Sequence, residues 1–125
     1  METQKVAIIG LGRIGSAFLS NMLARSGRGV ELVAVAETGD TPGRQQAVAE
    51  GLFITSLDEI LALGDGIDIL FDLTGIPAIR REIREKLMAQ RNHHTVVASE
   101  SIARLLWVMT TEDELPLIEG RSTGY

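Results

Sequence analysis

The sequence contains no cysteine, 4% aromatic residues and only 2 histidines. The lack of cysteine excludes disulfides, thiolate nucleophiles and cysteine-based metal sites. No apolar run approaches the roughly 18 residues that a membrane span needs, and the N-terminus has no basic leader ahead of an apolar stretch. We therefore expect a soluble, cytoplasmic protein without a membrane partner, whose redox chemistry would have to come from a bound cofactor.

An excess of positive charge is also missing, since the formal net charge is -5 at pH 7. The basic residues between positions 80 and 86 are interleaved with glutamates, so they form no basic face for a phosphate backbone. We expect no nucleic-acid partner. The 125 residues are enough for one domain with its own core, and too few for a second catalytic domain of ordinary size.

Short apolar runs alternate with helical patterns along most of the chain. Strands are expected at 5–9, 30–36, 53–55, 67–73 and 95–98, and helices at about 14–23, 44–50, 56–63, 77–87 and 102–110. This alternation predicts an α/β fold: a single-domain, three-layer, doubly wound parallel sheet of the Rossmann type with strand order 3-2-1-4-5. We expect residues 1–110 to form this dinucleotide-binding domain and residues 111–125 to form a C-terminal tail.

Local signals mark where some of these helices begin. Ser56 and Glu59 have the spacing of a capping box, in which each side chain bonds the other residue's free amide. Pro77 suits the first turn of the next helix. In the last helix, apolar side chains recur with helical spacing on one face, at Ile102, Leu105, Leu106 and Met109.

A glycine-rich turn follows the first strand and opens the first helix. It reads Gly10-Leu11-Gly12-Arg13-Ile14-Gly15. At such a turn, backbone N–H groups and the positive end of the helix converge where a pyrophosphate would lie. Gly10 would permit the tight turn, Gly12 would admit the phosphates, and Gly15 would let helix and strand approach closely. The turn therefore predicts a dinucleotide site.

An acidic residue supports this interpretation. Glu37 ends the second strand about 20 residues beyond the glycines, where an acid binds the ribose hydroxyls of a dinucleotide. A carboxylate there would repel the extra phosphate of NADP, so NAD is the favoured cofactor. Arg13 and Arg44 weaken this preference, because either could reach a phosphate. The alternative is that the glycines only form a tight turn and that Glu37 is a solvated loop acid.

Two further turns lie at the carboxyl ends of predicted strands. Thr74, Gly75 and Pro77 follow the fourth strand, where either a cofactor contact or a simple capping turn fits. The segment 99–101 follows the fifth strand and favours helix capping. His93 and His94 precede that strand, at the opposite end of the sheet, with no further ligand to complete a metal site. We expect no metal, and we identify no catalytic residue.

The run from Val6 to Asp72, with its GLGRIG, ELVAVAE, GLFITSLDEIL and DILFDLTG stretches, resembles the N-terminal domain of the glucose-fructose oxidoreductase and inositol dehydrogenase family. It is also similar to the corresponding domains of homoserine and aspartate dehydrogenases. The resemblance implies NAD(P) contacts at Gly10, Gly12, Arg13, Ile14, Gly15, Glu37 and Thr74. The oxidoreductase family carries Glu-Lys-Pro after the fifth strand, whereas this chain has Ser99-Glu100-Ser101 and its lysines are Lys5 and Lys86. The resemblance therefore covers the nucleotide domain without that family's catalytic lysine or substrate domain.

Three functions are consistent with these features. The first is a stand-alone NAD(P)-binding module that senses or regulates. The second is the nucleotide-binding part of an oxidoreductase whose substrate domain lies on another chain or was lost. The third is an interaction module that no longer binds its ligand. We also expect a homo-oligomer or a partner protein, because Trp107 and its apolar neighbours lack the cover that a second domain gives in relatives.

Overall fold

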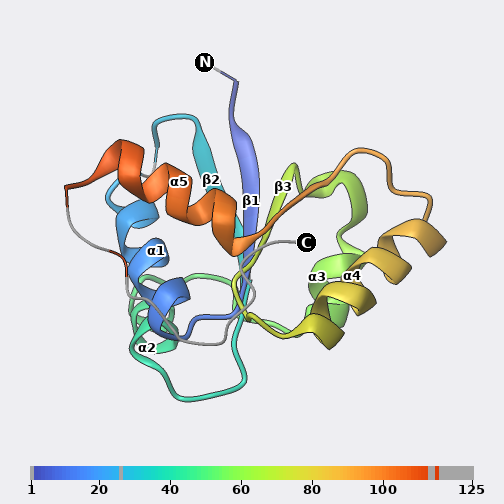
Figure 1. The fold of residues 1–125 in the computed structure, drawn as a ribbon, viewed down its shortest axis with the longest axis horizontal. Coiled ribbons are helices and arrows are strands. Elements are labelled where there is room, and N and C mark those ends of the chain that lie inside the picture. The colour runs from blue at the N-terminus through green and yellow to red at the C-terminus, as the bar shows by residue number, and fades with distance from the viewer. Residues whose placement is uncertain (1, 26, 113–114, 116–125) are drawn as a thin grey trace.

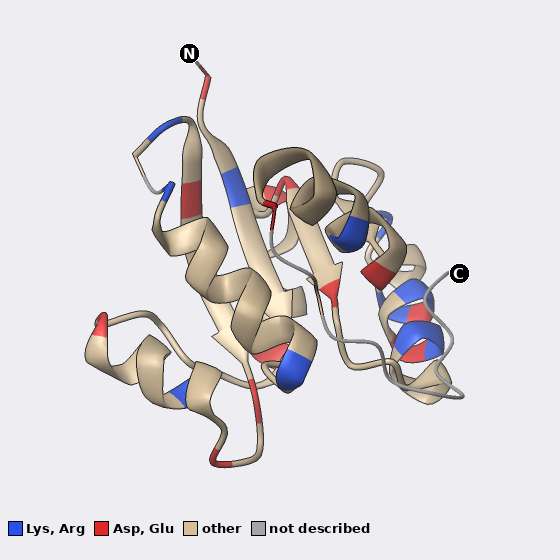
Figure 2. Cartoon of the chain, turned by 60° about the vertical axis from the view of Figure 1, so that its left-hand side comes forward, with Lys and Arg blue, Asp and Glu red and all other residues tan. Residues whose placement is uncertain are grey.

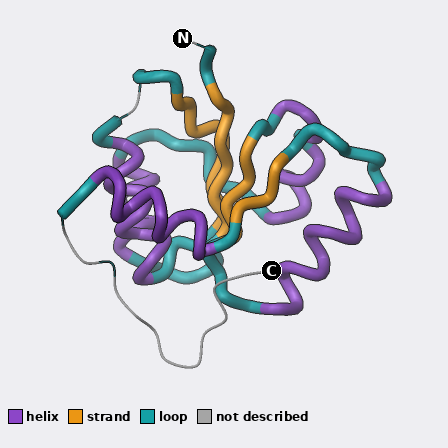
Figure 3. The backbone as a smooth tube through the Cα atoms, turned by 45° about the horizontal axis from the view of Figure 1, so that its top comes forward, coloured by secondary structure: helices purple, strands orange, loops and turns teal. Residues whose placement is uncertain are grey.

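A parallel β-sheet with helices on both faces makes up the protein, as the computed structural model shows for residues 2–25, 27–112 and 115 (Figure 1). In chain order the elements are β1 (Gln4–Ile9), α1 (Arg13–Leu23), β2 (Val30–Ala36), α2 (Pro42–Ala49), α3 (Leu57–Ala62), the short 3-10 helix η1 (Gly64–Gly66), β3 (Ile69–Asp72), α4 (Pro77–Ala89), β4 (Val96–Ala98) and α5 (Glu100–Thr110). Helices α1, α2 and α5 lie on one side of the strands, and α3 and α4 lie on the other (Figure 3). The predicted three-layer α/β fold is confirmed.

The sheet has four strands in the order β2-β1-β3-β4, and all of their pairings are parallel. The predicted strand at 53–55 is reduced to a single parallel bridge between Ile54 and Val35, on the outer side of β2. The predicted order therefore holds for the four strands that form, and the prediction of a full third strand at 53–55 was wrong. This segment fits only a few residues between the end of α2 and the start of α3, and Phe53 leaves 52% of its surface exposed.

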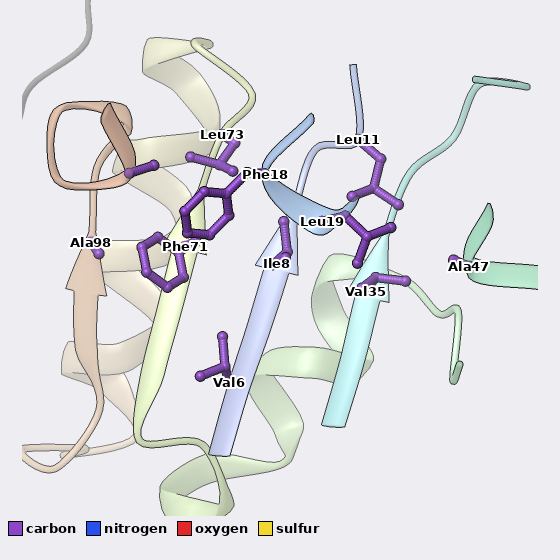
Figure 4. Packing of buried hydrophobic residues seen from close by; sticks show 11 residues of the cluster. Val6, Ile8, Leu11, Phe18, Leu19, Val35, Ala47, Phe71, Leu73 and Ala98 are labelled. Carbon is purple, nitrogen blue, oxygen red and sulfur yellow. The ribbon is translucent and has the colours of Figure 1, made fainter. Parts of the chain in front are cut away.

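Two apolar layers hold the helices to the sheet. Alternate residues of β1 point to opposite faces, so Val6 and Ile8 join the layer under α1, and Ala7 and Ile9 join the layer under α3 and α4. Figure 4 shows the first layer, where side chains of the strands meet those of α1. Burial on both faces explains why the strands are nearly continuous apolar runs.

The helix starts predicted at Ser56 and Pro77 are confirmed in position but not in every bond, whereas α2 and α5 each begin two residues before the predicted start. Ser56 accepts a hydrogen bond from the Glu59 amide at 3.1 Å, and Pro77 is the first residue of α4. The reciprocal half of the capping box was wrong. The Glu59 carboxylate accepts the Thr55 hydroxyl at 2.6 Å, a short charge-assisted bond. Ser99 is the N-cap residue of α5, but its side chain makes no capping hydrogen bond.

Helix α5 turns its apolar stripe outward. Ala103 is fully buried and Glu100 is 2% exposed. The side chains of the predicted stripe are exposed by 45%, 54%, 37% and 72% at Ile102, Leu105, Leu106 and Met109. No helix among the described residues has the length and apolar character needed to cross a membrane. The helix ends at Thr110, as expected, but residues 113–114 and 116–125 of the predicted tail lie outside the described part of the chain. The domain boundary stays a prediction.

Candidate functional site

Two of the three glycines in the turn between β1 and α1 are required by close packing. Gly10 has φ +96°, and a Cβ there would lie 2.9 Å from the backbone carbonyl carbon of Leu73. A Cβ on Gly15 would lie 1.9 Å from the Gly10 carbonyl oxygen. Gly10 therefore makes the tight turn against the end of β3, and Gly15 brings α1 against that turn, as the sequence pattern predicts.

Gly12 differs from both neighbours, because a Cβ at this position would have no atom within 4 Å. Gly12 is the N-cap residue of α1, with an extended backbone at φ -74° and ψ -150°. The first N–H groups of a helix have no partner within the helix, and the helix dipole gives this end a partial positive charge. The space beside Gly12 is thus open at a point that favours an anion.

Glu37, just beyond β2, points its carboxylate at the same turn. Its Oε1 accepts the Leu11 N–H at 2.7 Å and its Oε2 accepts the Gly39 N–H at 2.9 Å. A carboxylate oxygen can accept more than one hydrogen bond, so both oxygens retain capacity for hydroxyl groups. Arg44 lies at the same corner, where its Nε donates to the Glu37 carbonyl oxygen at 3.1 Å.

A cavity of about 350 Å³ opens between these groups, at the carboxyl ends of β1, β2 and β3. Of the predicted site residues, it is lined by Gly10, Gly12, Glu37 and Thr74. The others lie outside its lining: Leu11, Ile14 and Gly15 are buried, Arg13 and Pro77 are exposed, and Gly75 is half-buried.

Sequence reasoning missed much of the opposite wall of the cavity. Its residues come from the β2 end and the starts of α3 and α4: Thr38, Thr55, Ser56, Leu57, Ile76 and Ile79. One available signal was the cap at Ser56, which marks the start of α3. This start follows the segment that pairs parallel to β2, and the carboxyl ends of parallel strands meet at one edge of a sheet, so Ser56 could have been expected near the glycine turn.

The turn after β3 is held together by its own hydrogen bonds. The Thr74 hydroxyl donates to Asp72 Oδ1 at 2.7 Å and accepts the Ile76 N–H at 3.1 Å. The Thr74 amide also donates to Asp72 Oδ1, at 3.1 Å. These bonds order the turn before α4, although no side chain caps that helix, and Thr74 also lies on the cavity wall. The choice between a cofactor contact and a purely structural turn stays open.

The family model for the NAD-binding domain of homoserine dehydrogenase matches residues 10–104, most of the chain. The chain belongs to this family. Its membership confirms the predicted likeness to homoserine dehydrogenases and, at the level of the family, NAD as the cofactor. No curated protein matches the chain.

Solved structures give the same fold for this NAD-binding domain. GenD2 from gentamicin A biosynthesis, in complex with NAD, has a TM-score of 0.58 and 24% identity over 80% of this chain and 28% of that protein. Homoserine dehydrogenase from S. aureus has a TM-score of 0.58 and 17% identity over 90% and 31%. The Thiobacillus denitrificans enzyme has a TM-score of 0.50 and 26% identity over 78% and 23%. The chain thus spans less than a third of each of these proteins.

The remaining candidate groups of the NAD-binding domain lie away from the cavity. His94 pairs with Asp68 at the amino end of the sheet, with 2.6 Å between Nε2 and Oδ1. The Lys5 N–H, at 2.8 Å, and then His94 hold the pKa of Asp68 below its ordinary value. Basic and acidic residues alternate along α4 (Figure 2), and the pKa of its Lys86 is raised mainly by the Asp58 carboxylate of α3. Among the described residues, no group of three His, Asp or Glu side chains could hold a metal ion.

Proposed function

We propose that this domain binds NAD or NADH at the glycine turn, and that this binding serves a sensing or regulatory role. The observation that carries the proposal is the open N-cap at Gly12 beside a carboxylate that is already oriented. Pyrophosphate would accept hydrogen bonds from the N–H groups at the start of α1. The ribose hydroxyls would donate to Glu37, and the rest of the nucleotide would enter the cavity beyond it.

The composition of the cavity wall supports binding without a reaction. Among the described residues that line it, Glu37 is the only one with an ionisable side chain. Lys86 of α4 is engaged by Asp58 of α3 and by Glu82, and it does not line the cavity. His94 pairs with Asp68 at the other end of the sheet. The described lining would thus hold a nucleotide, and Glu37, which would bind the ribose, is the one group in that lining that could act as a general acid or base.

A second candidate is the nucleotide-binding part of an oxidoreductase whose substrate domain lies elsewhere. Family membership favours it, as does the coverage of relatives such as the S. aureus enzyme, of which the chain spans only 31%. Co-expression with a chain that supplies a substrate domain should then produce NAD-dependent turnover. If no such chain forms a complex with this domain, the sensing role is favoured.

The geometry counts against the third candidate, an interaction module that has lost its ligand. Such a protein would be expected to have Glu37 turned away and a side chain filling the turn. Instead, Glu37 accepts the Leu11 N–H at 2.7 Å, and the space beside Gly12 is open.

Calorimetric titration of the wild-type chain with NAD, NADH and NADP tests the proposal. We expect saturable binding of NAD and NADH and weaker binding of NADP. Gly12→Val would place a branched side chain in the space for the pyrophosphate and should lower the affinity at least about a hundredfold, or about 3 kcal/mol. Gly66→Val is the matched control, because Gly66 also has open space around its Cβ position but lies in η1, outside the cavity lining.

Both variants should unfold within a few degrees of the wild type. A wild-type chain that binds none of the three nucleotides would contradict the proposal. Equal loss of affinity in Gly66→Val and Gly12→Val would show that the loss does not arise at the turn.

A further inference from the structure

A hydroxyl group behind the glycine turn connects the turn to the next helix. Ser16 lies in the first turns of α1 and is half-buried. Its Oγ donates to the Leu11 carbonyl oxygen at 2.8 Å and accepts the Gly43 N–H of α2 at 2.9 Å. One side chain thus bonds both the nucleotide turn and the start of α2.

The close approach of α1 and α2 at this point depends on glycine. A Cβ on Gly43 would lie 2.3 Å from Ser16 Oγ and 2.9 Å from Ser16 Cα. Any larger residue at position 43 would push the two helices apart and break the bond to the hydroxyl. The Ser16–Gly43 contact is therefore a built feature of the domain and not an incidental surface contact.

The bond from Ser16 to Leu11 bears on the direction of the Gly12 N–H, which belongs to a residue that lines the cavity. The carbonyl of Leu11 and the N–H of Gly12 belong to the same planar peptide unit. Holding the carbonyl oxygen therefore also holds the Gly12 N–H, which lies at the start of α1 and has no partner within the helix. The hydroxyl thereby preorganises a donor for an anion without touching the anion itself.

The same bond closes a ring of hydrogen bonds around the corner of the site. The Leu11 N–H donates to Glu37 Oε1, and Arg44 Nε donates to the Glu37 carbonyl. Arg44 follows Gly43 in α2. The Gly43 N–H donates to Ser16 Oγ, which in turn donates to the Leu11 carbonyl oxygen and completes the ring. Glu37 also has an anchor of its own, because Oε2 accepts the Gly39 N–H. Loss of the Ser16 hydroxyl should therefore release the Leu11–Gly12 peptide more than it releases Glu37.

We propose that Ser16 is a positioning residue that holds the Gly12 N–H in the orientation that binds the pyrophosphate of a dinucleotide. This inference rests on the proposed nucleotide-binding function. It assigns a role to a residue outside the glycine pattern, and it predicts that the role is specific for one part of the ligand.

The test compares three ligands with Ser16→Ala. NAD and ADP-ribose contain the pyrophosphate, and adenosine does not. We expect Ser16→Ala to weaken NAD and ADP-ribose about five- to tenfold, the range for one lost hydrogen bond to a charged group. Adenosine, followed by NMR shift titration, should change less than about twofold. Ser20→Ala, an exposed serine one turn further along α1, is the matched control and should leave all three affinities unchanged.

The outcomes separate this inference from the function on which it rests. If the wild-type chain binds neither NAD nor ADP-ribose, the proposed nucleotide-binding function itself is contradicted. A wild-type chain that binds them, with a Ser16→Ala variant that binds them equally well, overturns only the role of Ser16. Equal weakening of adenosine and NAD also overturns it, because general loosening of the fold would act on every ligand. If Ser16→Ala does not fold, Ser16→Cys, which keeps a side chain of similar shape with a weaker donor, takes its place in the same comparison.

Discussion

Each end of β1 has a carboxylate that accepts a backbone N–H, and the two carboxylates differ in what else they meet. At the amino end, Asp68 accepts the Lys5 N–H at 2.8 Å, and its other oxygen pairs with His94. Beyond the carboxyl end, Glu37 accepts the Leu11 N–H at 2.7 Å and lines a cavity. Both oxygens of each carboxylate are engaged by the fold, since Glu37 Oε2 also accepts the Gly39 N–H. The difference is that Glu37 in addition lines the cavity at the carboxyl ends of the strands, and Asp68 does not.

This difference separates a structural acid from a candidate binding acid more clearly than residue type does. Both acids flank parallel strands, and both are held by the backbone beside β1. Parallel sheets bind ligands beyond the carboxyl ends of their strands, and the cavity of about 350 Å³ lies there. A hollow of about 590 Å³ also lies near the amino end, beside Asn92 and His94, but Asp68 is not part of its lining.

The largest expected effect concerns the packing beneath the glycine turn, at the carboxyl end of β1. Gly15→Ala would place a methyl group 1.9 Å from the Gly10 carbonyl oxygen, so α1 or the turn must shift. We expect a loss of about 3 kcal/mol or more in the free energy of unfolding, measured by urea denaturation. Gly12→Ala is the matched control, because a methyl group there would meet no other atom. It should change the free energy of unfolding by less than about 1 kcal/mol, through the lower entropy of the unfolded chain. Equal destabilisation by the two variants would show that Gly12 is also a packing residue.

The next prediction compares the effects of substitutions at Glu37 and Asp68 on the affinity for NAD. Glu37→Gln removes the charge but keeps an acceptor oxygen, and we expect NAD affinity to fall about tenfold by calorimetry. NADP should lose less or gain, because the repulsion of its extra phosphate disappears. Asp68→Asn should leave the affinity for NAD unchanged, as should Glu31→Gln, an exposed acid on β2. Similar losses from the variants at positions 37 and 68 would break the distinction between the two ends.

Much of this arrangement could be predicted from local signals in the sequence. The glycine spacing predicted three separate backbone roles, and the position of Glu37 at the end of β2 placed it beside the turn. The reason is that these features depend on strand ends, turns and helix starts, which short stretches of sequence encode.

Contacts between distant segments could not be predicted in this way. The Ser16–Gly43 contact joins residues far apart in sequence, and neither residue has an unusual pattern around it. The Ile54 segment is apolar enough for a strand, but its pairing is limited by the short connection between α2 and α3. Helical spacing identified the apolar stripe of α5 but not the direction in which it points, because Ala103 and Glu100 occupy the inner face instead.

A smaller effect is expected on self-association through the exposed apolar stripe of α5, which belongs to neither end of the sheet. We predict that the chain self-associates through this stripe, since Leu105 and Met109 are 54% and 72% exposed. Leu105→Ser should weaken association about fivefold, or about 1 kcal/mol, by analytical ultracentrifugation. Met88→Ser is the matched control, because Met88 is an apolar side chain on α4 that is 77% exposed. A wild-type chain that stays monomeric at high concentration would contradict this prediction.

The smallest expected effect is the pH dependence of stability that arises from Asp68 at the amino end of the sheet. The Lys5 N–H and His94 hold the pKa of Asp68 below its ordinary value, so the ionised carboxylate stabilises the folded state. That stabilisation is present above the pKa of an unfolded aspartate, about 3.9, and it is lost as the pH falls through the lower pKa of the folded state. Wild type should therefore be more stable than Asp68→Asn at pH 7, and the difference should shrink below about pH 4. Asp65→Asn, an exposed aspartate in η1, should show little difference from wild type across the same range. A constant difference between wild type and Asp68→Asn from pH 7 to pH 2 would mean that the side-chain shape, and not the charge, holds the amino end together.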